Sequence, residues 1–129
     1  MAKQSELRPT DAELEILRAL WDQGPCTVRD VWTTLNAAKP SGYTTVLKLM
    51  QIMADKGLVR RNEEQRAHVY EAMAPRETMQ RQLVGDLVKR AFGGSATQLI
   101  MQALATRRAT AEELSQIRQI LDEFERGAK

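Results

Sequence analysis

The stretch Ser41–Gly57, SGYTTVLKLMQIMADKG, constrains the fold of this chain more than any other. Apolar residues recur in it at i, i+3, i+4 and i+7, a spacing that lays one stripe along a helix. They are Val46, Leu49, Met50 and Met53. Gly57 follows this stripe where a left-handed residue would cap the helix, and Ser41 is placed to accept backbone N–H bonds at its start. The stretch therefore predicts an amphipathic helix with one buried face.

The opposite face of this helix carries small hydroxyls, an aromatic ring and a lysine. A solvated face is usually richer in Glu and Lys pairs. Its residues are Tyr43, Thr44, Thr45, Lys48, Gln51 and Asp55. Hydroxyls can approach bases and phosphates closely and lysine supplies charge, so these types suit a helix whose N-terminal half enters a DNA groove. An ordinary surface helix is the alternative, and the neighbouring segments decide between the two.

Two helices are predicted before this one from their start signals. Thr10 and Glu13 form a capping box, and Thr27 and Asp30 form a second box of the same kind. Pro40 bars the second helix from continuing into the central one. Three helices with a tight connection between the last two have the order of a helix-turn-helix. In that motif the second member of the pair reads DNA.

The sequence period changes after the central helix. Residues Leu58–Arg61 and Ala67–Ala72 are β-prone runs, and the polar segment Asn62–Arg66 between them predicts a turn. A β-hairpin directly after a helix-turn-helix makes a winged helix, whose wing lies beside the reading helix and meets the phosphate backbone. The arginines available for that contact are Arg60, Arg61 and Arg66.

Three more helices are predicted in the C-terminal part. The first begins at Pro75, which suits the first helical position, and the others start at Ser95 and Thr110. Their apolar stripes contain Met79, Leu83, Leu87, Leu99, Ile100, Leu104, Ile117, Leu121 and Phe124. Three short helices have too little core to stand alone. We expect them to pair with the same helices of a second chain; folding back on the N-terminal part is the alternative.

The predicted fold is mainly α with a small β wing. A winged-helix DNA-binding domain is expected over residues 1–74 and a helical dimerisation domain over residues 75–129. Two-fold pairing suits a reader of palindromic DNA. Basic residues outnumber acidic ones between residues 39 and 66, and the reverse holds between residues 6 and 22. The N-terminal domain is therefore expected to be polarised, with its basic end at the reading helix.

Composition excludes several classes of protein. Apolar residues are interspersed with charges throughout the 129 residues, so no membrane insertion is expected. The N-terminus MAKQSELRPTDAE has no apolar core of a secretory signal. One cysteine excludes an intramolecular disulfide, which fits a cytoplasmic location. One histidine, one cysteine, no Gly-rich phosphate loop and no metal-ligand spacing leave no catalytic constellation. We expect no enzyme, no metal and no cofactor.

The lone histidine and the lone cysteine have structural explanations. His68 lies in a β-prone run without a second histidine nearby, so a structural or surface role is favoured over metal binding. Cys26 is expected in a short extended segment as a small buried residue rather than as a redox sensor.

The chain resembles the penicillinase-repressor family, which includes the methicillin-resistance and copper-responsive repressors of bacteria. The resemblance runs from Leu7 to Phe124. It is carried by four motifs in order, Thr10-Asp-Ala-Glu-Leu-Glu-Ile16, Tyr43-Thr-Thr-Val46, Asp55-Lys-Gly-Leu-Val59 and Val69-Tyr70. It implies a winged helix with a three-helix dimerisation region, and a homodimer that covers a palindromic operator and blocks RNA polymerase. It also implies that Tyr43, Thr44, Thr45 and Lys48 face the DNA groove. Ser41 and Gln51 are the further candidates for DNA contact near this helix.

Two departures from the family pattern concern how repression is lifted. Many members are inactivated when a membrane-bound sensor protease triggers cleavage of an Asn-Phe bond in the dimerisation region. The corresponding bond here is Gln102–Ala103, so the scissile pair is missing. That protease, or its signalling product, is the partner that the resemblance implies for release. The copper-responsive branch carries a C-terminal cysteine cluster, which this chain lacks, so metal sensing of that type is excluded.

Two further hypotheses remain open. The winged helix could serve as a protein-interaction module whose basic wing binds an acidic partner. Such a module would bind DNA weakly and without regard to sequence. Alternatively, a small ligand lodged between the dimerisation helices could release the DNA in place of proteolysis.

Overall fold

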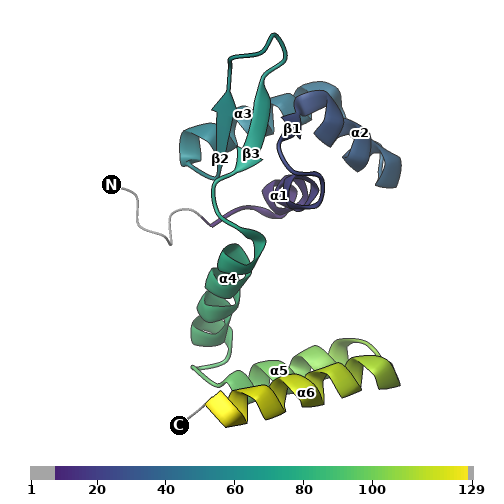
Figure 1. The fold of residues 1–129 in the computed structure, drawn as a ribbon, viewed down its shortest axis with the longest axis vertical. Coiled ribbons are helices and arrows are strands. Elements are labelled where there is room, and N and C mark those ends of the chain that lie inside the picture. Colours follow the sequence, from purple (N-terminus) through teal and green to yellow (C-terminus); the bar gives the residue numbers. More distant parts are fainter. Residues whose placement is uncertain (1–7, 128–129) are drawn as a thin grey trace. The chain divides into compact units, whose positions relative to one another are not determined.

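The structure, a computed structural model, describes residues 8–127. The N-terminal residues in which no secretory signal is expected lie mostly outside this range, as do the last two residues of the thiol-free C-terminus. The described chain is mostly helical with a small antiparallel sheet, which confirms the predicted fold class (Figure 1). It divides into two units, one up to Leu83 and one from Val84 onwards.

The first unit begins with three helices, α1 (Asp11–Gln23), α2 (Val28–Ala38) and α3 (Tyr43–Lys56). Both predicted capping boxes are present. Thr10 Oγ1 accepts the Glu13 N–H at 3.2 Å, and Thr27 Oγ1 accepts the Asp30 N–H at 3.2 Å. Gly57 ends α3 in the left-handed region with φ 86°, as predicted. The helix-turn-helix order read from the sequence is therefore the order observed.

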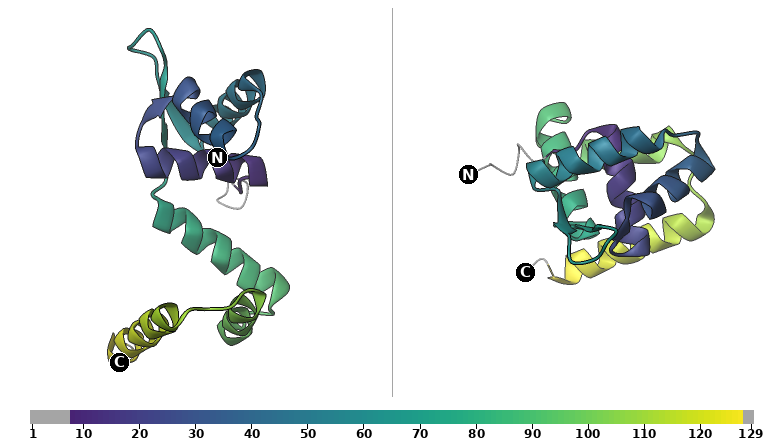
Figure 2. Two further views of the ribbon diagram at one scale, coloured as in Figure 1. Left: turned by 90° about the vertical axis from the view of Figure 1, so that its right-hand side faces the viewer. Right: turned by 90° about the horizontal axis from the view of Figure 1, so that it is seen from above.

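A small sheet completes the first unit. Its strands are β1 (Cys26–Thr27), β2 (Val59–Asn62) and β3 (Val69–Ala72), in the order β1-β3-β2 with both pairs antiparallel. The predicted hairpin is confirmed, with β2 shifted by one residue and β3 shorter than expected. The short extended segment at Cys26 is also confirmed, and it adds a third strand by pairing with Tyr70. The β2–β3 hairpin projects beyond the helices of this unit (Figure 2).

The core of the first unit lies between these helices and the sheet. The predicted stripe of α3 is inside it, since Val46, Met50 and Met53 are at most 3% exposed. α1 contributes Ile16 and Leu17, and other buried members are Leu20, Val28, Val31, Leu58, Val59 and Tyr70. Burial of this apolar surface holds α3 by one face and leaves the opposite face outside.

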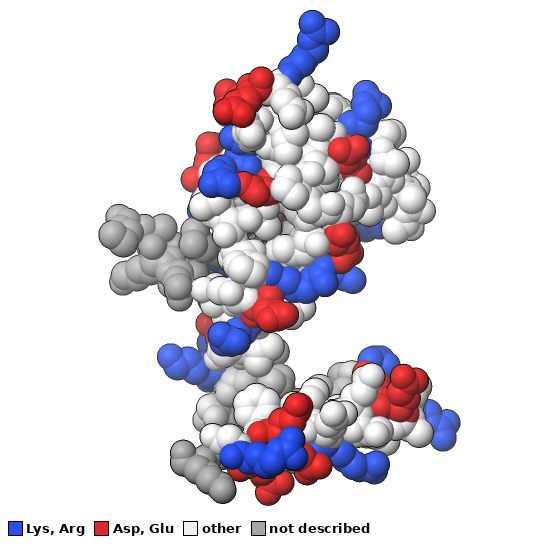
Figure 3. Space-filling view, in the orientation of Figure 1, with Lys and Arg blue, Asp and Glu red and all other residues white. Residues whose placement is uncertain are grey.

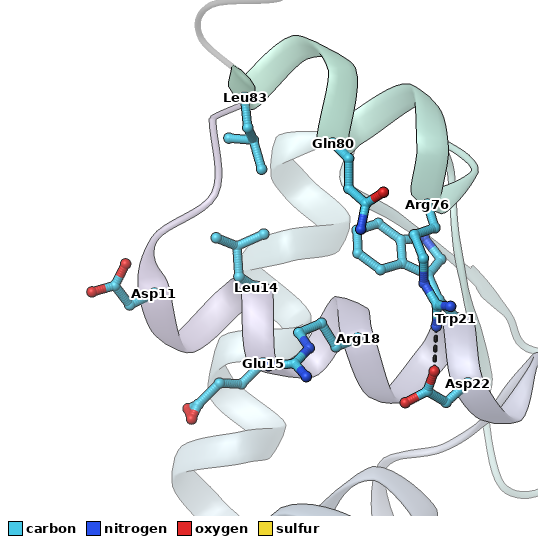
Figure 4. Close-up of a pocket in the computed structure, with 9 residues that line it drawn as sticks. All are labelled: Asp11, Leu14, Glu15, Arg18, Trp21, Asp22, Arg76, Gln80 and Leu83. Carbon is cyan, nitrogen blue, oxygen red and sulfur yellow. Dashed lines mark hydrogen bonds and ion pairs between the residues drawn. The ribbon is translucent and has the colours of Figure 1, made fainter. Parts of the chain in front are cut away.

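The start of α4 (Arg76–Ala91) belongs to the first unit. Trp21 Nε1 donates to the carbonyl oxygen of Ala74 at 3.0 Å, and Met79 is only 5% exposed in the core. The guanidinium of Arg76 lies 5.9 Å from the centre of the Trp21 ring and forms an ion pair with Asp22 (Figure 4). The prediction of Pro75 at the first helical position was wrong by one residue: α4 starts at Arg76, and the carbonyl of Pro75 accepts the Met79 N–H.

The second unit contains the rest of α4 with α5 (Ala96–Thr106) and α6 (Ala111–Gly127). Both predicted starts are confirmed: Ser95 Oγ accepts the Gln98 N–H at 3.1 Å, and Thr110 Oγ1 accepts the Glu113 N–H at 3.0 Å. No residue of α5 or α6 is buried. None of the helices within residues 8–127 is both long and apolar enough to span a membrane.

Candidate nucleic-acid interface

The turn between α2 and α3 is held by side chains of α2. Trp32 Nε1 donates to the carbonyl oxygen of Ser41 at 2.7 Å, and Asn36 Oδ1 accepts the Ser41 N–H at 3.0 Å. Ser41 does not cap α3, so that prediction was wrong. The N-cap is Gly42, which has no side chain to offer, and Ser41 Oγ instead donates to the carbonyl of Lys39 at 3.0 Å. The first turn of α3 therefore starts without a side-chain cap.

The outer face of α3 is formed by the residues that the sequence assigns to it. Tyr43 is 39% exposed, and the rest of this face is also exposed. These residues are Thr44, Thr45, Lys48, Gln51 and Asp55. Apart from Asp55 near its far end, the face is neutral or basic. A rigid helix thus presents hydroxyls, a phenol, an amide and an ammonium group to solvent, which is the donor and acceptor set that base edges and phosphates require.

Tyr43, the first residue of α3, is held by two residues of α2. Its ring meets Trp32 edge-on, with centroids 5.9 Å apart and an interplanar angle of 74°. The guanidinium of Arg29 lies 5.5 Å from the centre of the same ring. The sequence prediction missed Arg29. The available clue was a basic residue in the first turn of the helix that precedes the predicted reading helix.

The wing carries the three predicted arginines, but two of them have partners within the hairpin. Arg60 forms an ion pair with Glu71 across the strands, and Arg61 forms one with Glu63 at 2.8 Å. The neighbouring Tyr70 side chain, followed by Glu63, raises the pKa of Arg61 above its ordinary value. Arg66 lies in the exposed loop of the hairpin. Figure 3 shows a basic side chain projecting from this end of the first unit.

A groove of about 370 Å³ runs between α3 and the wing. Its polar and basic lining comes from Arg29, Gln51, Arg61, Arg66 and His68, and Tyr43 forms part of its wall. No carboxylate lines it among the described residues. This matters because acidic and basic side chains are interspersed over the face of the first unit seen in Figure 3. The groove beside α3 therefore has the charge that favours a polyanion, whereas the wider surface of the first unit mixes both signs.

A second pocket of the first unit has the opposite character. It lies between α1 and the start of α4, with a volume of about 450 Å³ (Figure 4). Three carboxylates line it, those of Asp11, Glu15 and Asp22, together with two guanidinium groups. Such a lining does not suit a nucleic-acid backbone.

The far end of α3 is tied to α1 by a buried carboxylate. Glu13 is 2% exposed, and its Oε1 accepts the Lys56 ammonium at 2.8 Å and the Thr10 N–H at 2.9 Å. Burial alone would raise the pKa of Glu13. The hydrogen bonds from Lys56 and Thr10, with the charge of Lys56, outweigh burial and hold this pKa below its ordinary value. The sequence indicated the capping role of Glu13 but not its partner in α3.

The predicted dimerisation residues fall into two groups. Met79 lies in the core of the first unit, and Leu83 packs partly against that core. These two side chains therefore pack within their own chain, at the end of α4 that belongs to the first unit. The second group lies on the remainder of α4 and on α5 and α6, where five residues are exposed: Leu87, Ile100, Leu104, Leu121 and Phe124. Leu99 and Ile117 are half-buried.

Several other residues complete the description of the second unit. Gln102 and Ala103, which are predicted from the sequence to correspond to the family's cleavage position, lie exposed within α5. Three further apolar residues are exposed that the prediction did not include: Val84, Met101 and Ile120.

The remaining predicted residues have structural roles. Cys26 is 8% exposed, and burial, with a smaller contribution from Asp30, raises the pKa of its thiol. A thiol shifted in this direction is less reactive, which agrees with the buried role predicted for it. His68 is exposed on the wing. Within residues 8–127 no group of three or more His, Cys, Asp and Glu side chains is arranged to hold a metal.

Comparison with known proteins identifies relatives over nearly the whole chain. A family model described as "Penicillinase repressor" matches residues 9–123. A protein named transcriptional regulator BlaI, from two strains of Mycobacterium tuberculosis, is 32% identical over 128 residues, which cover 98% of this chain and 91% of the relative. A penicillinase repressor of Bacillus licheniformis is 21% identical over 120 residues, covering 93% and 94%.

Proposed function

Because this chain belongs to the penicillinase repressor family, we propose that it is a homodimeric repressor that binds a palindromic operator. A family of transcriptional repressors also fits the expectation that the chain is not an enzyme. In this proposal α3 enters the major groove and the wing meets the adjacent phosphate backbone. The groove-facing residues are Tyr43, Thr44, Thr45, Lys48 and Gln51, and the wing contributes Arg66 with Arg60 and Arg61 beside it.

The observation that carries the proposal is the setting of α3. Its apolar face is locked into the core, its start is fixed by Trp32 and its end by Glu13. Its exposed face then borders a groove without a carboxylate in its described lining. A reading helix needs this combination, because base discrimination requires side chains at fixed positions and the phosphates require a positive surround.

The exposed apolar surface of the second unit supports dimerisation. α5 and α6 bury no residue within the chain, and Phe124 is 73% exposed. Large apolar side chains in this number are usually covered in a working protein. A second copy is the occupant that a palindromic operator also requires, because half-sites related by two-fold symmetry are read by subunits related in the same way.

The division of labour follows the predicted domains, with one refinement. Residues 1–74 would bind DNA and residues 75–129 would dimerise, but the first turns of α4 act with the DNA-binding part because Met79 lies in its core. Repression would be lifted in the cytoplasm by a signal that acts on the dimerisation region. The exposed Gln102–Ala103 bond lies inside α5, so a protease would need that helix to open locally before cleavage.

Fluorescence anisotropy with duplexes from the region upstream of the gene would test this proposal. A scrambled duplex of the same composition serves as the control, and both are titrated across a salt series. We expect a preference for the operator of roughly a thousandfold, with two chains bound per site. Weak binding that is equal for the two duplexes and lost at moderate salt would contradict the repressor and favour an adaptor for an acidic protein.

A further inference from the structure

The contacts of Arg29 differ from those of the other arginines near the reading helix. It is exposed in the first turn of α2, and it takes part in none of the ion pairs found among residues 8–127. Its guanidinium instead lies over the Tyr43 ring, 5.5 Å from the ring centre. Arg60 and Arg61, by contrast, are paired with glutamates of the hairpin. The partner of Arg29 is therefore a residue of the reading helix itself.

The Tyr43 ring is confined from two directions. Arg29 covers it, and Trp32 meets it edge-on with centroids 5.9 Å apart. Trp32 is itself fixed, because its Nε1 donates to the Ser41 carbonyl at 2.7 Å. Tyr43 nevertheless keeps 39% of its surface exposed. The ring is thus ordered before any ligand arrives, while part of it stays accessible.

We propose that Arg29 determines operator specificity by holding the Tyr43 ring where it meets the bases. This inference rests on the proposed function, since it concerns how α3 reads its site. The first residues of a reading helix are those that reach base edges. A side chain already held in its bound position loses less freedom on binding, and a small displacement of it removes a contact.

The planar shape of the arginine side chain is central to this role. A guanidinium can stack flat on an aromatic ring, whereas a lysine ammonium is a compact charge without a plane. A charge alone would strengthen binding to every duplex alike, because phosphates carry no sequence information. Arg29→Lys therefore separates the two roles, since it keeps the charge and removes the planar group that lies over the Tyr43 ring.

The test compares the intact chain with Arg29→Lys, using a duplex selected by the unmodified protein from a random pool and a scrambled duplex. We expect the operator preference to fall about tenfold, with unchanged affinity for the scrambled duplex and an unchanged salt slope. Arg18→Lys is the matched control, because Arg18 is an exposed helical arginine that lines the other pocket of the same unit. It should leave all three quantities unchanged.

A double-mutant cycle tests whether Arg29 acts on operator specificity through Tyr43. In the Tyr43→Leu background, Arg29→Lys should cause no further loss of operator preference. The unfolding midpoints should agree among all variants, which separates positioning from folding. A weaker near-ultraviolet circular dichroism signal of free Arg29→Lys would report the released ring.

Three results would overturn the inference. Arg29→Lys could keep the full operator preference. Alternatively, Arg29→Met could lower affinity for both duplexes equally and reduce the salt slope, which would make Arg29 a simple phosphate contact. The losses of operator preference caused by Arg29→Lys and Tyr43→Leu could also be fully additive in the double-mutant cycle. Failure of the proposed function looks different, because the unmodified protein would then select no preferred duplex from the pool.

Discussion

Gly42 leaves the N-terminus of α3 without a side-chain cap. It occupies the N-cap position with φ −79°, a conformation open to any residue, and a Cβ placed there would lie 3.4 Å from Thr45 Oγ1. A capping side chain would therefore fit. Its absence leaves the positive end of the helix dipole facing the proposed DNA, where a phosphate can take the place of a cap.

Gly42→Asp should separate folding from DNA binding. The aspartate caps α3 and complements its dipole, so the free energy of unfolding should rise by about 0.5 kcal/mol. The same negative charge repels phosphates, so affinity for any duplex should fall on the order of tenfold or more. Gly42→Asn is the neutral control and should stabilise without that loss. If both variants bind DNA equally well, the start of α3 does not approach the backbone.

The Glu13–Lys56 pair should make stability depend on pH. The folded-state pKa of Glu13 is lowered from an ordinary value of 4.5, so its contribution is complete above about pH 4.5 and disappears as pH falls through the lower folded value. Glu13→Gln should reduce the free energy of unfolding by about 1–2 kcal/mol at pH 7. Urea unfolding at pH 7 and pH 3 measures this difference. A difference that persists undiminished at pH 3 would rule out the carboxylate as its source.

At the scale of helices and strands, local sequence signals predict where elements start and end but not which distant elements contact each other. Both capping boxes, the Gly57 cap and the stripe of α3 follow from residues within a few positions of one another, so the sequence was sufficient to predict them. Other contacts join residues that are far apart in the sequence. Examples are the pairing of β1 with β3 and the contact between Glu13 and Lys56, which are 43 positions apart. No periodicity encodes such pairs, because tertiary packing decides them. Arg29 was missed for the same reason: its contact with Tyr43 depends on the α2–α3 turn.

The first turns of α4 should be necessary for the stability of the first unit. A chain that ends at Ala74 loses buried Met79 and the contact of the Arg76 guanidinium with the Trp21 ring. Its free energy of unfolding should be lower than that of a chain ending at Ala91 by about 3 kcal/mol. Urea titrations followed by tryptophan fluorescence compare the two. Equal midpoints would mean that the predicted boundary at residue 74 also separates the folding units.

At the scale of the whole molecule, the exposed side chains of α6 should hold two copies together. Phe124→Asp should raise the dissociation constant of the proposed dimer by roughly thirtyfold or more, because it places a charge among side chains that the partner would cover. The unfolding of the first unit should not change, since Phe124 is 73% exposed within its own chain. Analytical ultracentrifugation at micromolar protein is the measurement. Gln119→Asp, an exposed position of the same helix, adds the same charge as a control.

Because α5 and α6 have no buried core within one chain, the concentration of the protein could itself affect regulation. A subunit without a partner would keep the apolar side chains of these helices exposed, and proteases and chaperones recognise such surfaces. If the chain forms the proposed homodimer, the number of dimers follows the square of the subunit concentration while dimers are scarce. Halving synthesis would then leave about a quarter of the dimers. Occupancy of the proposed operator would then fall more steeply than in proportion to gene dosage.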